Sequence, residues 1–322
     1  LFNYIQIHSP MKPFLPILLL SACAILQAQP SATPAAQRMQ SYQQRKALEA
    51  ASIVNGVEFR SIGPTVHSGR IVDVDIREDD PSHFYAAFAS GGLWKTTNNG
   101  NSFEPLFDKE AVMTIGDVAV NWKNNTIWLG TGENNSSRSS YAGAGMYKST
   151  DGGKSWQHLG LEESHHISRI ILHPTDPNTF YTCSVNGGLW RTQDGGNNWI
   201  NMNFYFPIQS ASHLAINPDN TNNLFAITGY ANGGSSVSAN SCDIWVTYDA
   251  GGNWYKTNFN STLTSNASRG NKIVFMPGFT NVLLAATSNG LYRSTDFGNN
   301  WTQIIFNQIF DISIRVFKRV WD

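Results

Sequence analysis

The repeating unit of this chain is written most fully in Gly145-Met146-Tyr147-Lys148-Ser149-Thr150-Asp151-Gly152-Gly153-Lys154-Ser155-Trp156. The same template returns in register at residues 188–199, 243–254 and 290–301, and a degenerate copy occupies 92–103. Each full copy runs from an apolar and an aromatic residue through Ser or Thr to the pattern x-Asp-x-Gly-x-x-Trp. This order predicts the second half of a β-strand, a tight turn and an aromatic residue at the start of the next strand.

The turn part of the template has a direct physical interpretation. Its aspartate can accept hydrogen bonds from backbone N–H groups one or two residues further on, and its last glycine suits a positive φ. We expect its tryptophan to bury a large ring between neighbouring repeats. The residues concerned are Asp151, Asp194, Asp249 and Asp296, then Gly153, Gly196, Gly251 and Gly298, and finally Trp156, Trp199, Trp254 and Trp301.

Recurrence decides between two interpretations of these aspartates. A catalytic carboxylate is needed once or twice in an active site, whereas this one returns in every repeat at a turn, so we interpret the aspartates as structural. Equivalent positions lie 43 to 55 residues apart, within reach of the repeat lengths of propeller blades. We therefore predict an all-β protein, a β-propeller of four-stranded blades whose hairpins carry the aspartates.

The repeat also predicts how many blades the chain contains. Within residues 55–322 we expect about five complete blades and the start of a sixth. The expected blades are 70–107, 112–160, 167–203, 211–258 and 270–306, with a partial blade at 310–322. An incomplete ring leaves two sheet faces exposed, so we expect the chain to be the N-terminal part of a longer propeller.

The pattern Ser/Thr-x-Asp-x-Gly-x-x-Trp is identified as the Asp-box, or BNR repeat, and the chain resembles the β-propellers that carry it. Two further stretches, Phe59-Arg60-Ser61-Ile62-Gly63-Pro64 with Ser68-Gly69-Arg70-Ile71 and residues 130–141, resemble large secreted bacterial BNR-repeat proteins. Those proteins are described as glycosyl-hydrolase-like and as related to the sortilin, or VPS10, propeller. The resemblance covers about residues 55–305 and implies an exported propeller without settling its ligand.

The resemblance to enzymes of this kind is interrupted at important positions. A sialidase opening of Phe-Arg-Ile-Pro is broken here by Ser61 and Gly63. Ala89 stands where xyloglucanase-like enzymes place a catalytic Asp two residues before a Gly-Gly pair. Hydrolysis by carboxylates needs a pair held at a defined separation. The weak candidates that remain for a catalytic role are Asp73, Asp117 and Glu133.

Irregular loops indicate which mouth of the propeller binds a ligand. Long excursions at 132–143 and 229–241 lie on the side opposite the repeat turns, and loops that vary on a repeating scaffold are the usual place for a site. The first loop combines an acid, a base and an aromatic platform in Glu133, Asn134, Arg138 and Tyr141. These side chains either contact a carbohydrate or peptide, or pack against one another in a surface loop.

A second set of polar residues occupies one equivalent position near the start of each innermost strand. Alternation along a strand predicts that these side chains point toward the central channel, whereas their apolar neighbours pack between blades. Such a ring of mixed charge would either grip a polar ligand or neutralise itself by ion pairing. Its members are Asp73, Asp117, Arg169, His213 and Lys272, with Arg70 at the start of blade one.

The N-terminal residues indicate export. Met11-Lys12, the apolar run at 14–20 and the small residues after it are typical of a secretory signal, and we expect cleavage after Ala28 within residues 1–28. The alternative is a bacterial lipobox at 20–23, which would anchor the chain through a lipid on Cys23. Residues 29–54 are expected to form a linker and a polar helix over 35–52. In both cases we expect a periplasmic or extracellular protein, with no transmembrane segment in the mature chain.

Composition excludes other classes of function. The chain has 322 residues and a formal net charge of −1, so it lacks the basic excess of a nucleic-acid-binding surface.

Cys183 and Cys242 are interpreted as buried thiols, with a disulfide between them as the alternative. His165 and His166 have no third ligand at a metal-binding spacing, so we expect neither a metal nor another cofactor.

Three functions remain open from the sequence. The first is a non-catalytic propeller that recognises a glycan, peptide or protein at the mouth opposite the Asp-boxes. The second is a glycoside hydrolase of the sialidase or xyloglucanase type, and the third is an assembly chaperone, by analogy with photosystem-assembly propellers. The residues expected to bind the ligand are Arg70, Asp73, Asp117, Glu133, Arg138, Tyr141, Arg169, His213 and Lys272.

Overall fold

The computed structural model describes residues 33–57, 69–134, 140–185, 187–207, 209–229, 242–259 and 269–305. The expected export signal with Cys23, the stretch 59–64, Arg138 and the partial blade at 310–322 lie outside the described residues. Within those ranges the chain forms one α-helix and five four-stranded antiparallel sheets. The prediction of an all-β propeller with about five blades is confirmed.

Each sheet is one blade, and its strands follow one another in chain order. Blade one contains β1 (Ile71–Ile76), β2 (Phe84–Phe88), β3 (Gly92–Thr96) and β4 (Glu104–Pro105), and blade two contains β5 (Ile115–Asn121), β6 (Thr126–Thr131), β7 (Met146–Ser149) and β8 (Gln157–His158). Blade three, which follows the short 3₁₀-helix η1 (Glu162–Ser164), contains β9 (Ile167–Leu172), β10 (Phe180–Ser184), β11 (Gly188–Thr192) and β12 (Ile200–Asn201). Blade four contains β13 (Ala211–Ile216), β14 (Leu224–Thr228), β15 (Ile244–Thr247) and β16 (Tyr255–Lys256), and blade five contains β17 (Gly270–Met276), β18 (Phe279–Thr287), β19 (Gly290–Ser294) and β20 (Thr302–Ile305).

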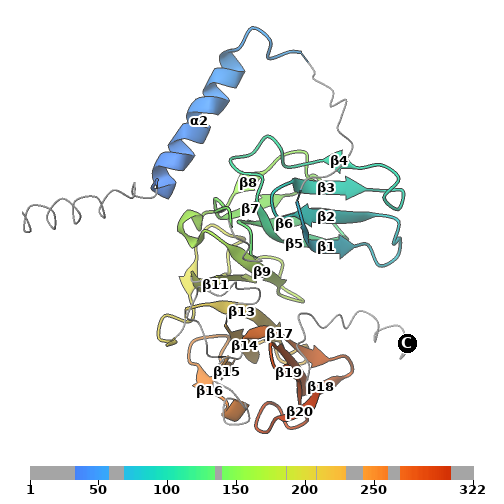
Figure 1. Cartoon of the computed structure of the whole chain (residues 1–322), viewed down its shortest axis with the longest axis vertical. Helices are drawn as coiled ribbons and strands as arrows, with labels where there is room; N and C mark the ends of the chain where they lie inside the picture. Colours follow the sequence, from blue (N-terminus) through green and yellow to red (C-terminus); the bar gives the residue numbers. More distant parts are fainter. Residues whose placement is uncertain are drawn as a thin grey trace, which may run out of the picture.

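The blades are arranged in the order of the sequence. The first strand of each blade is its innermost strand and contacts the first strand of the next blade, from β1 through β5, β9 and β13 to β17. In Figure 1 the series runs from the teal strands of blade one near the top to the orange and red strands of blade five at the bottom. Contacts between neighbouring blades are therefore made near their inner edges.

The hydrophobic core is divided between successive blades. One cluster joins Tyr85 of β2 to Leu129 of β6, and another joins Phe225 of β14 to Leu283 of β18. Two further clusters lie between blades two and three and between blades three and four. Each sheet thus buries apolar side chains against its neighbours, which is the packing that a repeated four-stranded unit requires.

The outermost strands are shorter than the sequence pattern predicts. The repeat predicts four or five residues for each, such as 156–159 in blade two, whereas in blades one to four they contain two residues each. An outermost strand has a pairing partner on one side only, and a short edge strand leaves few unpaired backbone groups. The middle strands, paired on both sides, begin and end within three residues of the positions predicted from the repeat, which in blade two are 126–131 and 146–149.

The repeat turns share one hydrogen-bond pattern. In blade three the Thr192 hydroxyl donates to Asp194 Oδ1 (2.8 Å) and accepts from the backbone N–H of Gly196 (2.9 Å). Asp194 Oδ1 also accepts from the backbone N–H of Asn198 (2.9 Å). Gly196 has a φ of 101°, a value that glycine adopts without a Cβ clash. The same bonds recur at Asp151, Asp249 and Asp296.

The aspartates reach further along the chain than we expected. The backbone N–H that Asp194 accepts lies four residues on, at Asn198, and not one or two. The nearer N–H groups are already taken, because that of Gly195 donates to the carbonyl oxygen of Asn178 and that of Gly196 donates to the Thr192 hydroxyl. The hydroxyl and the carboxylate therefore close the turn together.

The tryptophan of each repeat contacts the preceding blade. Trp156 Nε1 donates to the carbonyl oxygen of Leu106 (2.9 Å), and Trp199 Nε1 donates to that of Leu159 (2.7 Å). In blade five, Trp301 packs edge-on against Phe259, with ring centroids 5.2 Å apart. The turn of one blade is thereby attached to the outer end of the blade before it.

The turn carboxylates predict a loss of stability in acid. Hydrogen bonds from Asn198 lower the pKa of Asp194 to about 2, and hydrogen bonds from Asn253 lower that of Asp249 to about 2. Because these pKa values are lower in the folded chain than in the unfolded chain, the stabilisation is present above about pH 4 and is lost as the pH falls toward 2. We expect urea denaturation to show this decrease, and Asp194→Asn should weaken it. If Asp194→Asn and the original chain lose stability identically as the pH falls, the hydrogen-bonded Asp194 carboxylate is not a source of this loss.

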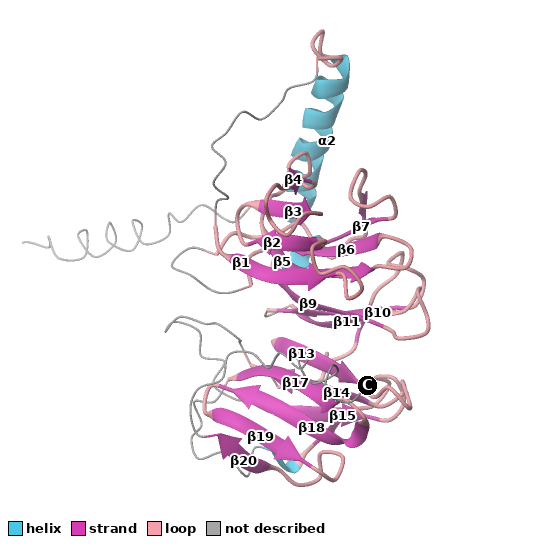
Figure 2. Ribbon diagram, turned by 90° about the vertical axis from the view of Figure 1, so that its right-hand side faces the viewer, coloured by secondary structure: helices cyan, strands magenta, loops and turns pink. Residues whose placement is uncertain are grey.

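Helix α2 (Ala35–Ala51) braces the outside of the first two blades. Arg38 Nη1 donates to the carbonyl oxygen of Gly143 (2.7 Å), and the Tyr42 hydroxyl donates to the Glu110 carboxylate (2.6 Å). Toward the other end of the helix Leu48 is 73% exposed, and Figure 2 shows this end extending beyond the sheets. The expected polar helix at 35–52 is present, and its hydrogen bonds to the propeller extend from Arg38 to Arg45.

Two further expectations can be compared with the structure. Cys183 and Cys242 are buried and not bonded to each other, so the interpretation as thiols is confirmed and the alternative of a disulfide is wrong. Burial raises the pKa of the Cys242 thiol well above its usual value, which keeps it protonated and unreactive. None of the helices in the described part of the chain has the length and apolar character needed to cross a membrane.

Candidate functional site

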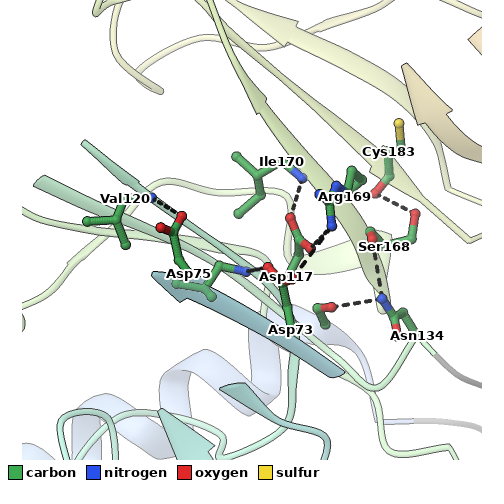
Figure 3. Close-up of polar contacts among 11 residues, drawn as sticks. Asp73, Asp75, Asp117, Val120, Asn134, Ser168, Arg169, Ile170 and Cys183 are labelled. Carbon is green, nitrogen blue, oxygen red and sulfur yellow. Dashed lines mark hydrogen bonds and ion pairs between the residues drawn. The ribbon is translucent and has the colours of Figure 1, made fainter. Parts of the chain in front are cut away.

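The innermost strands of blades one to three are joined by aspartate side chains (Figure 3). Asp75 Oδ2 accepts from the backbone N–H of Val120 (3.0 Å), and Asp117 Oδ2 accepts from that of Ile170 (2.7 Å). Asp73 Oδ2 makes a longer bond of the same kind, 3.4 Å, with Val118 of β5. The innermost strand of a blade has a backbone pairing partner on one side only, so these carboxylates satisfy N–H groups on its other edge.

Serine side chains continue this connection into blades four and five. Ser168 Oγ donates to the carbonyl oxygen of Ala211 (3.3 Å), and Ser212 Oγ donates to that of Gly270 (2.6 Å). Carboxylates therefore accept backbone N–H groups between the early blades, and hydroxyls donate to backbone carbonyls between the later ones. The centre of the molecule is held together by side-chain contacts to the backbone.

Asp117 and Arg169 form an ion pair at the centre of this network. Arg169 Nη1 lies 3.1 Å from Asp117 Oδ1 and 3.7 Å from Asp73 Oδ1. Burial raises the pKa of Asp117 well above its usual value, Arg169 acts to lower it, and the nearby carboxylate of Asp73 raises it further. The charge of the Arg169 guanidinium is thus compensated by carboxyl groups within the cluster. This arrangement fits the second alternative given for the mixed ring, in which its charges neutralise one another by ion pairing.

Asp117 does not point into the channel as the strand alternation predicted. It is buried, and its carboxylate lies against β9. The reason is that both faces of an innermost strand pack against neighbouring blades: Val118 belongs to the core cluster with blade one, and Ala119, on the same face as Asp117, belongs to the cluster with blade three. A β-bulge, an extra residue in one strand, also lies near the start of every innermost strand. The extra residues are Val72, Gly116, Ser168, Ser212 and Asn271.

The later members of the predicted ring differ from the first three. His213 is buried, and burial lowers its pKa well below the usual value, with the positive charges of Arg169 and Lys272 acting in the same direction. A neutral imidazole is therefore expected at neutral pH. Lys272 is partly buried on β17. Two of the five ring residues, Asp117 and His213, are thus buried and the other three are partly buried, with three of the four charged residues in blades one to three.

The mouth beside this cluster carries more exposed side chains. Arg70 and Glu133 form an ion pair in which Glu133 is buried and the Arg70 side chain is 51% exposed. The backbone N–H of Glu133 donates to the carbonyl oxygen of Tyr141 (3.1 Å), and Tyr141 is 57% exposed. Asn134 Nδ2 donates to the carbonyl oxygens of Gly116 and Ser168, at 2.8 and 3.2 Å. The loop that begins at 132 is therefore attached to blades one, two and three.

The histidine pair does not form a metal site with its neighbours. His165 Nε2 lies 3.8 Å from Glu163 Oε2, and burial lowers the pKa of His166. Within the described ranges no three His, Cys, Asp or Glu side chains gather in a metal-binding arrangement. We assign no cofactor to this region.

The carboxylates of the cluster are badly placed for glycoside hydrolysis. Retaining and inverting enzymes hold their two carboxyl groups about 5 to 9.5 Å apart across the substrate. Here the carboxylates of Asp73 and Asp117 share Arg169, whose Nη1 lies 3.7 and 3.1 Å from their oxygens, and Asp117 is also bonded to Ile170. Both carboxylates therefore contact the same guanidinium of this chain instead of facing each other across a substrate.

Comparisons with known proteins agree with the fold. A family model described as Sortilin-Vps10 (sortilin, neurotensin receptor 3) matches residues 144–236. The GH74 enzyme of Niastella koreensis superposes with a TM-score of 0.54 at 17% identity, covering 75% of this chain and 38% of that one. The chain is a β-propeller that is similar in part of its sequence to sortilin and in its fold to a GH74 enzyme.

Two xyloglucanases extend the comparison of this propeller. Xyloglucanase Xgh74A of Acetivibrio thermocellus is 25% identical over 172 residues, which are 47% of this chain and 20% of that protein. The GH74 xyloglucanase of Xanthomonas campestris superposes with a TM-score of 0.53 at 19% identity, covering 73% of this chain and 38% of that one. The chain spans about a fifth of the curated relative and well under half of each structure.

Sequence reasoning missed three residues of the central network. Asp75 accepts a backbone N–H group of the next blade as Asp117 does, and Ser168 and Ser212 donate to backbone carbonyls of the next blade. Of these four residues, Asp117 alone was singled out from the sequence. A signal for them exists, since Ser168 and Ser212 directly precede the aligned residues Arg169 and His213. A polar residue that recurs beside an aligned charged position is therefore worth testing as a contact between blades.

Proposed function

We propose that this propeller is an exported recognition module that binds a glycan at the mouth opposite the repeat turns. The binding surface is formed by Arg70, Glu133 and Tyr141, and by Arg138 on the same loop. Asp73, Asp117, Arg169, His213 and Lys272 form the floor beneath it and hold the blades that carry it. Export follows from the signal-like N-terminal residues, with lipid anchoring through Cys23 as the second route.

One observation carries the proposal: the central carboxylates are engaged in holding the protein together. Asp117 accepts from Ile170 and pairs with Arg169, and Asp73 lies in the same network. A general acid and a nucleophile must both reach the substrate, whereas the buried Asp117 contacts other parts of this chain. Recognition without cleavage is the function that fits these contacts best.

The mouth has the chemistry of a carbohydrate-binding surface. The half-exposed guanidinium of Arg70 is oriented by the buried Glu133, and the exposed ring of Tyr141 offers an apolar face. Sugar rings present C–H faces that pack on aromatic rings and hydroxyls that hydrogen-bond to charged groups. The similarity to two xyloglucanases favours a glycan over a peptide or a protein as the ligand.

Glycoside hydrolysis is the second candidate, favoured only by the similarity to xyloglucanases. Ala89 occupies the position at which those enzymes are expected to carry a catalytic aspartate. An assembly role with a protein partner is the third candidate. These functions differ in a simple readout, because a hydrolase releases reducing ends, a glycan-binding module retains the glycan intact and a chaperone does neither.

The test is titration of the purified chain with xyloglucan oligosaccharides, cello-oligosaccharides and sialyllactose, combined with an assay for reducing ends. We expect binding without release. Replacing Tyr141 with alanine should raise Kd about tenfold, since the loss of one aromatic stacking contact is worth up to roughly 1.4 kcal/mol. Tyr248→Ala is the matched control, because Tyr248 is an exposed tyrosine that directly precedes Asp249 in the repeat turn of blade four.

Three outcomes would contradict this proposal. Release of reducing ends that disappears in Asp73→Asn or Asp117→Asn, in a variant with an unchanged circular dichroism spectrum, would establish a hydrolase. If the protein binds none of the glycans tested, the ligand is to be sought among peptides and proteins. Equal loss of affinity in Tyr141→Ala and Tyr248→Ala would remove the mouth as the site.

A further inference from the structure

A separate hollow lies on the outside of the propeller, between helix α2 and the outer edges of blades one and two. Its volume is about 670 Å³, and it is lined by Tyr42 and Lys46 of the helix, by Glu104 and Lys109 near blade one, and by Lys154 and Trp156 of blade two. Arg70, Glu133 and Tyr141 are not among its lining residues. We name this hollow the helix cleft.

The helix cleft is held open by hydrogen bonds at its rim. Tyr42 donates to Glu110 (2.6 Å), and Arg45 Nη2 donates to the carbonyl oxygen of Lys109 (2.7 Å). One turn before Tyr42, Arg38 is bonded to Gly143 of blade two. The helix is therefore attached to both blades, and a ligand would enter a site that is already formed. The volume is within the range of small-ligand sites, about 300 to 1,000 Å³.

Charges of both signs line the helix cleft in equal number. Three lysines, Lys46, Lys109 and Lys154, face it together with three carboxylates, Glu104, Asp108 and Glu110. A site for an anion or a cation would show an excess of one sign. Balanced charges instead supply hydrogen-bond donors and acceptors side by side, and hydroxyl groups use both.

Aromatic side chains supply the apolar part of the helix cleft. Tyr42 and Trp156 are half-buried, and their rings come from opposite walls, one on the helix and one on blade two. The hydroxyl of Tyr147, which also lines the cleft, is buried and has no hydrogen-bond partner within the described chain. A buried hydroxyl without a partner is costly, and a ligand hydroxyl would satisfy it.

We propose that the helix cleft binds a neutral oligosaccharide. Alternating donors and acceptors match the hydroxyls of the sugar, and the rings of Tyr42 and Trp156 match its C–H faces. This site is independent of the mouth assigned above, because the two share none of the residues used in either argument. A glycan-binding chain with both sites would contact a long polysaccharide at two separated points, which increases its effective affinity.

An extended peptide fits the helix cleft less well. Peptides that add a strand to a sheet need a run of free backbone groups along the edge. The two edge strands here, β4 and β8, have two residues each, and Pro105 of β4 has no N–H to donate. The backbone would therefore contribute little to the binding of a peptide.

The test is calorimetric titration of the whole chain with cellohexaose and with a neutral xyloglucan oligosaccharide. We expect Tyr42→Ala to raise the Kd of the cleft site about tenfold, the effect of losing one stacking contact. Lys154→Ala should raise it several-fold and leaves the contacts between the helix and the blades in place. The matched controls are Tyr255→Ala, a 58% exposed tyrosine on the outer strand of blade four, and Lys123→Ala, an exposed lysine in the β5–β6 turn.

The outcomes separate this site from the mouth. The proposal is supported if the helix cleft binds the oligosaccharide more weakly in Tyr42→Ala and Lys154→Ala. Binding at the cleft should be unchanged in both controls and in Tyr141→Ala. Wild-type affinity in Lys154→Ala and Tyr42→Ala overturns it, as does binding of the acidic oligogalacturonate or of an unstructured peptide in place of the neutral sugars. Loss of binding in Tyr141→Ala alone would place the glycan at the mouth only.

Discussion

Replacing Gly116 with alanine is expected to destabilise the propeller by about 3 kcal/mol or more. Gly116 is the extra residue of the bulge at the start of β5. A Cβ at this position would overlap the carbonyl oxygen of Ile167 on β9 and would also meet that of Gly132. Both obstacles are backbone atoms, so blades two and three would have to move apart. Thermal denaturation should show a melting temperature lower by roughly 10 °C.

The control for this variant is Gly56→Ala. An added Cβ at Gly56 meets no atom within 4 Å, and the residue does not have a positive φ, so we expect its melting temperature to stay within about 2 °C of the original. Equal melting temperatures for Gly116→Ala and Gly56→Ala would show that the close approach of β5 and β9 does not contribute to stability.

The second large effect is expected for Asp117→Ala, about 3 kcal/mol of stability. The substitution removes the acceptor of the Ile170 N–H and the nearer partner of Arg169 in one step. A buried N–H without an acceptor costs about 1 to 3 kcal/mol, and a partly buried guanidinium that loses a carboxylate adds to this. Asp117→Asn keeps an oxygen that can accept from Ile170, so chemical denaturation should show a smaller loss.

The pH dependence of this variant has a defined sign. Burial raises the pKa of Asp117 in the folded chain although Arg169 acts to lower it, so ionising Asp117 costs more in the folded chain than in the unfolded chain, and its contribution to stability decreases as the pH rises from about 4 toward the raised pKa. The turn aspartates have the opposite dependence, at lower pH. The difference in unfolding free energy between the original chain and Asp117→Asn should therefore diminish from pH 4 to pH 7. A difference that grows over this range would show that Asp117 is ionised and stabilised in the folded protein.

The amino-acid sequence by itself determined the architecture. The recurrence of Asp151 and its equivalents at a nearly constant spacing, followed each time by a tryptophan, requires a repeated hairpin, and its chemistry is local: a hydroxyl, a carboxylate and a glycine within six residues. Local interactions of this kind can be predicted from residue order, because the atoms involved are brought together by one turn. The same reasoning located the middle strands and the helix at 35–52.

Tertiary structure alone decided which side chains form the candidate site. Asp117 lies against Ile170 because the face of β5 that carries it packs on blade three, and this packing between blades is not contained in the sequence pattern of one repeat. The helix cleft likewise depends on where α2 docks, through Tyr42 and Glu110, residues 68 positions apart. Contacts between distant segments depend on packing and not on local order, and for this reason the blades were predictable from the sequence whereas their contacts were not.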